Sequence, residues 1–169
     1  MIKLKDLLKL DEIKYAGSIK PKHQKRMERE LKHIHEVQVK HMPPPENSSH
    51  ETREELNWLK NYNNGEVNEE VVKRGDNIKK VYREYCEENK LKYPKEYISE
   101  LIKDSGKIIY HLKYKFNRPR PKQVAEFLDM IYHNYTESMH TPSYPSGHST
   151  QGILSERSCP KCIQVMKKN

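Results

Sequence analysis

The sequence contains no long apolar run. No stretch approaches the ~18 consecutive apolar residues that a membrane-spanning helix requires. The N-terminal residues MIKLKDLLKLDEIKY start with basic charge, but charged residues between positions 6 and 12 interrupt their apolar part, unlike the core of a secretory signal peptide. We therefore expect a short amphipathic helix with Leu4, Leu7 and Leu8 facing inward, in a soluble, cytoplasmic protein without a transmembrane segment.

Cysteine is scarce as well, with three residues in the whole chain. Three cysteines do not make a disulfide framework, so we expect a reducing compartment. Cys159 and Cys162, in SCPKC, have the spacing of half a zinc site, but a second pair of ligands at finger spacing is missing. We interpret them as an exposed pair and Cys86 as a core residue on a helix, and we expect no cofactor.

The charge balance is positive. The 169 residues include 32 Lys and Arg against 24 Asp and Glu, a net charge of +8, and 33% of the residues are charged. Such a surface favours anionic partners: phosphorylated small molecules, nucleic acid or an acidic membrane face. The length predicts a single domain over residues 1–169, and nothing in the sequence indicates an oligomeric state.

Apolar residues recur at helical spacing along nearly the whole chain, and no alternating run is long enough for a strand, which predicts an all-α fold. We expect one mostly exposed helix over residues 19–41, with Met27, Leu31 and Ile34 facing inward. The three prolines of MPPPENSSH end this helix, since proline cannot continue it. Ser48 or Ser49 then caps the next one.

Four further helices are expected. The first of them begins after Ser48 or Ser49 and ends at NNG, where Gly65 adopts the left-handed conformation. The next is longer and covers residues 67–90, with an interruption at Gly75. Pro94 suits the first turn of the next helix. Their inward-facing candidates are Leu56, Leu59 and Tyr62; Val67, Val71, Ile78, Val81, Tyr82 and Tyr85; Ile98, Leu101, Ile102, Ile109 and Leu112; and Val124, Phe127, Leu128 and Ile131.

A basic, proline-rich stretch, KYKFNRPRP, lies at residues 113–121, between the last two of these helices. The prolines stiffen the backbone, so Arg118 and Arg120 project from a rigid segment. Guanidinium groups grip phosphate oxygens with two parallel hydrogen bonds, and Lys113 adds a point charge. This pattern predicts a phosphate site, although a solvated basic linker has the same composition.

A second unusual stretch is PSYPSGHST, residues 142–150. Gly147 lets backbone N–H groups approach an anion closely, and the Ser146 hydroxyl adds a donor at a helix start. Ser149 and Thr150 suit the cap of that helix. His148, beside an anion, is a candidate proton donor. The plain alternative is a proline-rich turn with an ordinary surface histidine.

Taken together, the two stretches resemble one superfamily. Lys113, six further residues and Arg120-Pro121, followed by Pro145-Ser146-Gly147-His148, are similar to the first two motifs of the phosphatidic-acid phosphatase type 2, class A acid phosphatase and vanadium haloperoxidase superfamily. The family pattern is K-x6-R-P, P-S-G-H and S-R-x5-H-x3-D. Counting back from Arg120 gives Lys113, whereas counting back from Arg118 gives His111, so Arg120 fits the pattern.

The resemblance covers about residues 95–152 and implies a helical bundle of the acid phosphatase/haloperoxidase type. Residues 1–90 supply N-terminal helices of unassigned role, and residues 153–169 form an atypical tail. By position, the resemblance implies that Lys113 and Arg120 hold the phosphate oxygens of a phosphorylated small-molecule substrate. It further implies that Ser146 and the Gly147 backbone complete the cradle, and that His148 protonates the leaving alcohol.

The third motif is the departure from the pattern. In the family its histidine is the nucleophile that forms a phosphohistidine, and an aspartate orients that histidine. The residues after His148 contain neither histidine nor aspartate, and covalent catalysis without its nucleophile loses most of its rate. From the change of character at SCPKC we expect a coding sequence that is truncated or shifted in frame, and a fold incomplete at its C-terminus.

Three upstream histidines are the nearest substitutes. On a helix His111 points about 160° away from Lys113, whereas His133 and His140 lie in the loop that leads to His148. We interpret all three as surface residues.

The sequence therefore predicts a soluble phosphoesterase of the acid phosphatase type that hydrolyses phosphate monoesters. One alternative keeps the site but binds vanadate as cofactor, as in the haloperoxidases, which also need the third-motif histidine. The other alternative is a non-catalytic binder of phosphate groups or nucleic acid. Its contacts would come from Lys113, Arg118, Arg120 and Lys122, with base stacking on Tyr110, Tyr114, Tyr132, Tyr135 and Tyr144.

Overall fold

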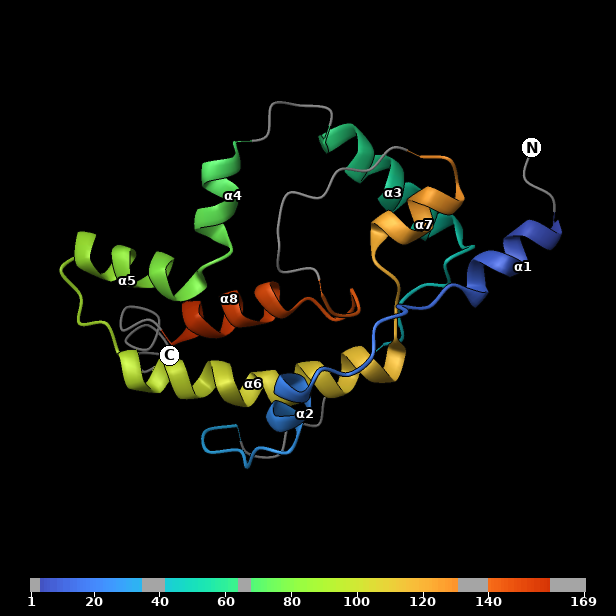
Figure 1. Ribbon diagram of the computed structural model, residues 1–169. Coiled ribbons are helices and arrows are strands. Elements are labelled where there is room, and N and C mark those ends of the chain that lie inside the picture. Colours follow the sequence, from blue (N-terminus) through green and yellow to red (C-terminus); the bar gives the residue numbers. More distant parts are fainter. Residues whose placement is uncertain (1–3, 35–41, 64–67, 131–139, 159–169) are drawn as a thin grey trace. The chain divides into compact units, whose positions relative to one another are not determined.

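A computed structural model of the chain describes residues 4–34, 42–63, 68–130 and 140–158. Over these residues helices are the only regular secondary structure, which confirms the all-α prediction (Figure 1). The helices are α1 (Leu4–Glu12), α2 (Pro21–Met27), α3 (His50–Asn63), α4 (Glu69–Gly75), α5 (Ile78–Glu88), α6 (Lys95–Phe116), α7 (Pro121–Phe127) and α8 (Gly147–Arg157).

The chain divides into two compact units, each assembled from three separate segments. The first unit comprises residues 1–18, 40–69 and 113–144, and the second comprises residues 19–39, 70–112 and 145–169.

In the first unit, one buried cluster joins three helices. Leu10 of α1, Leu56 of α3 and Val124 of α7 are at most 3% exposed and pack together. Leu8 is 62% exposed, so its predicted inward orientation is wrong, and Leu10 takes the buried position of α1 instead. Pro121 begins α7, as its fixed φ allows, while Phe127 at the other end is exposed.

Polar side chains tie α1 to the segment before α3. The buried Asn47 amide donates to the carbonyl of Leu10 at 2.8 Å and to that of Ile13 at 3.0 Å. Asp11 accepts from both the backbone and the hydroxyl of Ser48. Ser49 Oγ accepts from the Thr52 N–H at 3.1 Å, which confirms a serine cap for α3.

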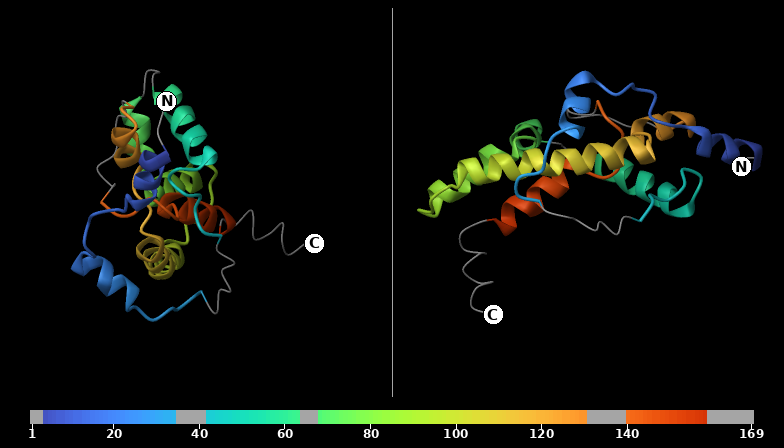
Figure 2. Two further views of the ribbon diagram at one scale, coloured as in Figure 1. Left: turned by 90° about the vertical axis from the view of Figure 1, so that its right-hand side faces the viewer. Right: turned by 90° about the horizontal axis from the view of Figure 1, so that it is seen from below.

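In the second unit, the long helix α6 is the central element, and Figure 2 shows it as one uninterrupted helix. Its residues Ile98, Leu101 and Ile109 are buried, as is Cys86 of α5, which was predicted as a core residue. α5 packs against α8, where the Tyr82 hydroxyl donates to the Gly152 carbonyl at 3.0 Å. α2 contacts α6 through His23, whose ring stacks on that of Tyr110 with 4.5 Å between the ring centroids.

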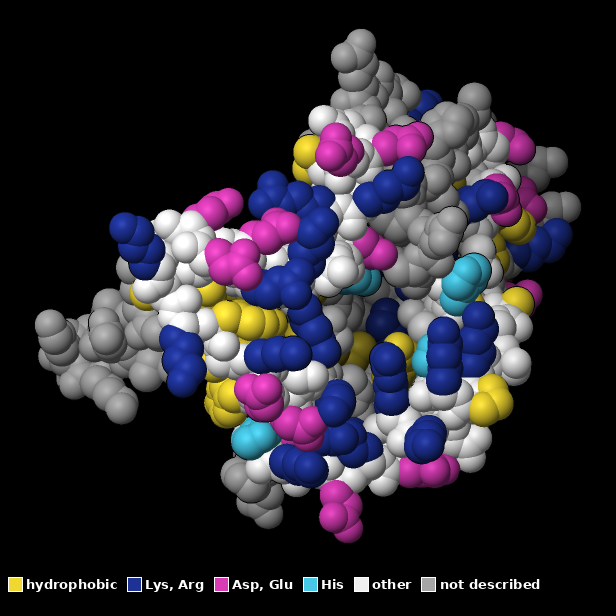
Figure 3. Space-filling view, turned by 60° about the vertical axis from the view of Figure 1, so that its left-hand side comes forward, with side chains coloured by type: hydrophobic (Ala, Val, Ile, Leu, Met, Phe, Trp, Pro, Cys, Tyr) yellow, Lys and Arg dark blue, Asp and Glu magenta, His cyan; other side chains and the backbone are white. Residues whose placement is uncertain are grey.

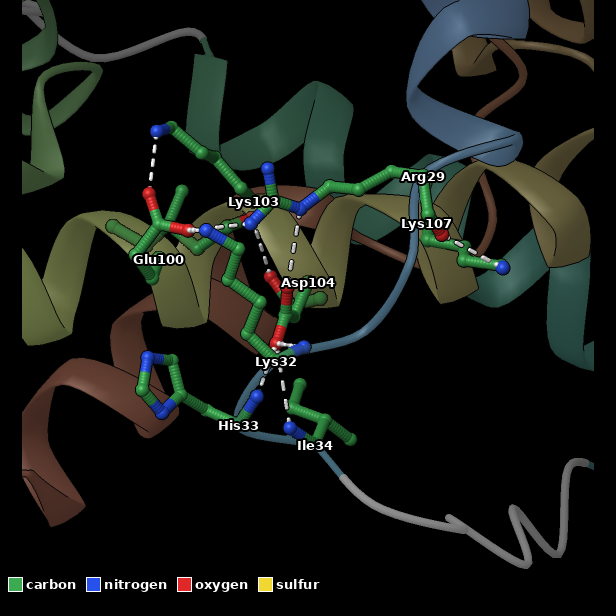
Figure 4. A network of polar contacts seen from close by, with 10 residues as sticks. Arg29, Lys32, His33, Ile34, Glu100, Lys103, Asp104 and Lys107 are labelled. Carbon is green, nitrogen blue, oxygen red and sulfur yellow. Dashed lines mark hydrogen bonds and ion pairs between the residues drawn. The ribbon is translucent and has the colours of Figure 1, made fainter.

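Asp104 anchors the residues that follow α2 (Figure 4). Its carboxylate is fully buried in α6 and accepts from three consecutive N–H groups, those of Lys32, His33 and Ile34. Arg29 donates to the same carboxylate at 3.2 Å and to Glu100 at 2.5 Å. Burial alone would raise the pKa of Asp104, but the donated hydrogen bonds outweigh it and lower that pKa.

Two predicted helices differ from those in the structure. The helix expected over 19–41 ends at Met27, because the next residues turn and donate their N–H groups to Asp104. The helix expected over 67–90 is two helices, since α4 stops at Gly75 and Asn77 caps α5 by accepting from the Lys80 N–H. Gly65 and Ile131, also assigned to predicted helices, lie outside the described residues.

None of the described helices is both long and apolar enough to cross a membrane.

Candidate functional site

The first unit holds the lysine and arginine of the predicted phosphate site. Lys113 lies in the last turn of α6 and is only 6% exposed. α6 ends after Phe116 because Asn117 adopts a left-handed conformation, with φ of 48°, and donates its N–H to the Lys113 carbonyl at 2.8 Å. Asparagine tolerates this conformation better than most residues do.

Residues 141–143 lie beside this stretch. The Ser143 N–H donates to the Arg118 carbonyl at 3.0 Å, and its hydroxyl donates to the Pro119 carbonyl at 2.7 Å. Thr141, Pro142 and Pro119 are buried. The two proline-rich stretches singled out in the sequence therefore contact each other in the first unit.

Lys113 and Arg120 converge on two adjacent main-chain oxygens. Lys113 Nζ donates to the Pro142 carbonyl at 2.5 Å. Arg120 Nε donates to the Thr141 carbonyl at 2.6 Å, and its Nη2 donates to the Thr141 hydroxyl at 3.0 Å. Both side chains thus donate to the segment 141–142, which lies four to five positions before Ser146 in the chain.

The environment of Lys113 alters its acidity. Burial of the ammonium group, together with the positive charge of Arg120, lowers the pKa of Lys113 to about 7. Desolvation of a charged amine favours its neutral form, and a neighbouring cation acts in the same direction. An anion bound between the two side chains would oppose both effects and keep the lysine charged.

Arg118 is placed differently from Arg120. Its Nη2 lies 3.1 Å from Glu55 Oε2 and 3.4 Å from the Thr52 hydroxyl, both on α3. Arg118 therefore pairs with a carboxylate, whereas Arg120 shares the 141–142 segment with Lys113. The two arginines of the motif have separate tasks in this structure.

The second unit holds the serine, glycine and histidine of the second stretch, at the start of α8. Ser146 is the N-cap, and its hydroxyl oxygen accepts from the Ser149 N–H at 3.2 Å. The prediction that Ser149 and Thr150 cap this helix is wrong: they lie in its first turn, and the Thr150 hydroxyl donates back to the Ser146 carbonyl at 2.8 Å. Serine at this position satisfies an N–H group that has no partner within the helix.

Gly147 is the first residue of α8, and neither packing nor conformation requires glycine there. A Cβ atom at this position would meet only the Cγ2 of Ile109, at an ordinary contact distance of 3.8 Å. No glycine in the described residues has a positive φ. Packing and conformation therefore do not explain the glycine, and the close approach of a ligand to its backbone stays a prediction.

His148 contacts an aspartate from a distant part of the sequence. Its Nε2 lies 3.0 Å from Asp76 Oδ1, in the turn between α4 and α5, and the two side chains are 50% and 35% exposed. The imidazole is therefore oriented by a carboxylate while much of the ring stays accessible. Sequence reasoning missed Asp76, because its only local signal is its place directly after Gly75.

The structure describes some of the other candidate histidines and tyrosines. His111 is exposed, with Nε2 at 3.2 Å from the Met27 carbonyl, and His140 is exposed. Two of the tyrosines suggested for base stacking contact side chains of the chain itself: Tyr110 stacks on His23, and Tyr144 meets Phe116 edge-on. His133, Tyr132, Tyr135, Cys159 and Cys162 lie outside the described residues.

The structure thus brings Lys113 and Arg120 together in the first unit, and keeps Ser146, Gly147 and His148 together in the second. No protein-family model, curated protein or solved structure matches the chain.

Proposed function

We propose that the protein binds the phosphate group of a small phosphomonoester and promotes its hydrolysis in the manner of the acid phosphatases. Lys113 and Arg120 bind the phosphate oxygens, Ser146 and the Gly147 backbone complete the cradle, and His148 protonates the leaving alcohol. The net charge of +8 suits such an anionic substrate.

The convergence of Lys113 and Arg120 on the same segment supports this proposal most strongly. Two cationic side chains, with six residues between them in sequence, donate to this segment at 2.5–3.0 Å: Lys113 to Pro142, and Arg120 to Thr141. Phosphate oxygens carry more negative charge than main-chain carbonyls and are better acceptors for these donors. An incoming phosphate therefore competes favourably for the same hydrogen bonds.

The start of α8 supports the roles of the other residues. Successive N–H groups at the first turn of a helix favour an anion, and Ser146 precedes that turn with its hydroxyl at the cap. His148 lies in the same turn and is half exposed, as a residue that transfers a proton to a substrate must be.

A non-catalytic phosphate binder is the second candidate, and the contacts of Lys113 and Arg120 support it equally. Residues 149–169 contain no histidine and no aspartate, so this stretch does not carry the residues of the third motif. This candidate uses the same Lys113 and Arg120 and differs only in the absence of turnover.

Vanadate and inorganic phosphate binding, measured by calorimetry on the full chain, tests the phosphate site. We expect Arg120→Gln and Ser146→Ala each to weaken vanadate binding by roughly tenfold, the ordinary size of one charge-assisted contact. Arg118→Gln is the matched control, since Arg118 pairs with Glu55, and it should leave binding within about twofold. Combining Arg120→Gln with Ser146→Ala reveals whether the two residues act on one ligand, through a non-additive effect. Unchanged vanadate binding in the Arg120→Gln protein would refute the proposal.

Hydrolysis of an aryl phosphate by the full chain then separates the two candidates. Turnover that disappears in His148→Ala supports the phosphatase, because His148 is half exposed and its removal should not unfold the protein. Vanadate binding without turnover supports the non-catalytic binder.

A further inference from the structure

The turn between α4 and α5 projects an aspartate toward the start of α8. α4 stops at Gly75, the Asp76 N–H donates to the Val72 carbonyl at 3.0 Å, and Asn77 caps α5. Asp76 is therefore held from both sides by helix ends, although the turn lies on the surface. This fixed position places its carboxylate 3.0 Å from His148 Nε2.

The contact determines which imidazole nitrogen is available to a substrate. A carboxylate only accepts, so His148 must donate to it from Nε2, and Nδ1 is the nitrogen left for another partner. A carboxylate behind an imidazole holds the ring in one orientation, as in other acid–base sites. Asp76 is thus a positioning residue that acts through His148.

A hollow of about 370 Å3 adjoins this pair in the second unit. Asp76 lines it directly, and so does Gln151, which lies three residues after His148 and therefore on the same side of α8. The other lining residues are Lys73, Asn77, Ile78, Lys79 and Ile102.

The chemistry of the lining indicates the kind of ligand. Two lysines outweigh the one negative charge of Asp76, so the lining carries net positive charge. The amides of Asn77 and Gln151 offer both donors and acceptors, and two isoleucines provide a small apolar surface. The volume is in the range of small-molecule sites. A short polar alcohol that carries a carboxylate or a second phosphate fits this combination better than an apolar or a cationic one.

We propose that this hollow receives the alcohol part of an anionic phosphomonoester and that Asp76 orients His148 to protonate its oxygen. The inference rests on the proposed function and names its substrate class. A water molecule attacks phosphorus and forms the new phosphorus–oxygen bond as the bond to the ester oxygen breaks. The proton on Nδ1 of the imidazolium moves to the departing oxygen, and the water gives up its own proton to solvent. The imidazole is left neutral, with its remaining proton on Nε2 facing Asp76.

Competition between matched ligands tests the hollow. Calorimetry on the full chain compares 3-phosphoglycerate, which has a carboxylate, with O-phosphoethanolamine, which has an ammonium group. We expect 3-phosphoglycerate to bind at least about fivefold more tightly than O-phosphoethanolamine, since its carboxylate is attracted by the two exposed lysines of the hollow and the ammonium group is repelled. In a Lys73→Gln/Lys79→Gln protein the difference should fall below about twofold. Lys80→Gln is the control, because Lys80 belongs to the same helix, lies 3.8 Å from Glu84 and does not line the hollow.

Inorganic phosphate separates this inference from the proposed function. If phosphate binds to the unaltered protein and to both lysine variants equally, but the two esters bind alike, the substrate class proposed here is wrong and the phosphate site stands. If inorganic phosphate does not bind at all, both proposals are overturned.

The role of Asp76 is tested by the reactivity of His148 toward diethyl pyrocarbonate, followed by peptide mass spectrometry. This reagent attacks unprotonated imidazole nitrogens and reacts less readily at Nδ1, which lies beside the backbone, than at Nε2. The contact with Asp76 keeps the proton on Nε2 and covers that nitrogen, so only Nδ1 is left to react. We expect several-fold faster modification of His148 in Asp76→Ala and a return toward the original rate in Asp76→Glu. His111 in the same protein is the internal control and should react at an unchanged rate. Equal His148 rates in all three proteins would show that Asp76 does not orient the imidazole.

Discussion

At the residue scale, Lys113 is a charged group in an environment very different from water. Its ammonium is 6% exposed, donates to the Pro142 carbonyl and lies near a second cation, Arg120. A lysine in such surroundings opposes folding in its charged form and does not oppose it in its neutral form. The stability of the protein should therefore depend on pH through this one side chain.

The expected dependence has a definite sign. The pKa of Lys113 is about 7 in the folded protein and has its ordinary value of 10.5 when unfolded, so the unfolded chain binds more protons between these values. The free energy of unfolding should rise with pH from about 7 to about 10.5, by at most about 1.4 kcal/mol per pH unit. Lys113→Met should remove this slope, as measured by urea unfolding at several pH values. Identical slopes in the two proteins would contradict the placement of Lys113.

Gly147 offers a second residue-scale test, because packing does not account for the missing side chain and the proposed phosphate cradle would. Gly147→Ala should leave the free energy of unfolding unchanged or raise it by up to about 1 kcal/mol, since the added Cβ meets only Ile109 at 3.8 Å. The same substitution should weaken vanadate binding several-fold. Gly152→Ala, in the same helix and with nothing within 4 Å of its Cβ, should bind vanadate normally; equal binding by both variants would remove the role assigned to Gly147.

At the element scale, Asp104 determines where α2 stops and how the following turn is held. A fully buried carboxylate accepts three N–H groups of that turn and the Arg29 guanidinium. Replacing one member of a buried, charged network leaves the other members without their partner. When this carboxylate is neutralised, the turn after α2 should therefore detach from α6.

Asp104→Asn is expected to lower the free energy of unfolding by about 2–4 kcal/mol. The amide keeps the shape of the carboxylate but has one acceptor oxygen in place of two and no charge for Arg29. Chemical denaturation measures the effect, and Glu96→Gln, an exposed change in the first turn of the same helix, should stay within about 0.5 kcal/mol. A loss no larger than that of the control would mean that Asp104 does not anchor the turn.

The same elements show what the sequence predicts and what it does not. Helical periodicity predicted all-α structure and the serine cap of α3 correctly, because these depend on residues close in sequence. It failed for residues 19–41, where Asp104, more than 70 positions away, competes for the N–H groups. It failed at α1 as well, since the choice between Leu8 and Leu10 depends on the helices that pack there.

The candidate site shows the same division. The sequence predicts the motif residues themselves, and local signals place Lys113 at a helix end and Ser146 before a helix. The partners Thr141, Pro142 and Asp76 were not predicted, because each contact joins residues more than 20 positions apart. Whether the site binds phosphate remains a prediction of the motif.

At the scale of the whole molecule, the distribution of charge bears on the nucleic-acid alternative. Figure 3 shows lysine and arginine side chains over the visible face with acidic side chains among them. Several of these cations are paired, for example Arg74 with Glu84 at 2.9 Å and Lys103 with Glu100 at 2.6 Å. A mixed surface of this kind suits a small anion held in one place better than a long polyanion.

Salt dependence distinguishes the two ligands. The affinity for vanadate should change by no more than about threefold between 50 and 200 mM salt, since only one or two charges are matched. A polyanion that neutralised six or more cations would lose about a thousandfold over the same range. Single-stranded RNA binding with such a steep slope, together with weak vanadate binding, would favour the nucleic-acid interpretation.

The order of the segments along the chain has a consequence for synthesis. Each unit takes one segment from the first 40 residues, one from the middle and one from beyond residue 112, so no short continuous fragment contains either of them. While the protein is being translated, the first unit has all of its residues only when position 144 has left the ribosome, and the second has to wait for α8. Contacts between segments so far apart in sequence also slow folding. The nascent chain therefore exposes Leu10 and Leu56 throughout most of translation, and chaperones that bind apolar segments should meet this protein early.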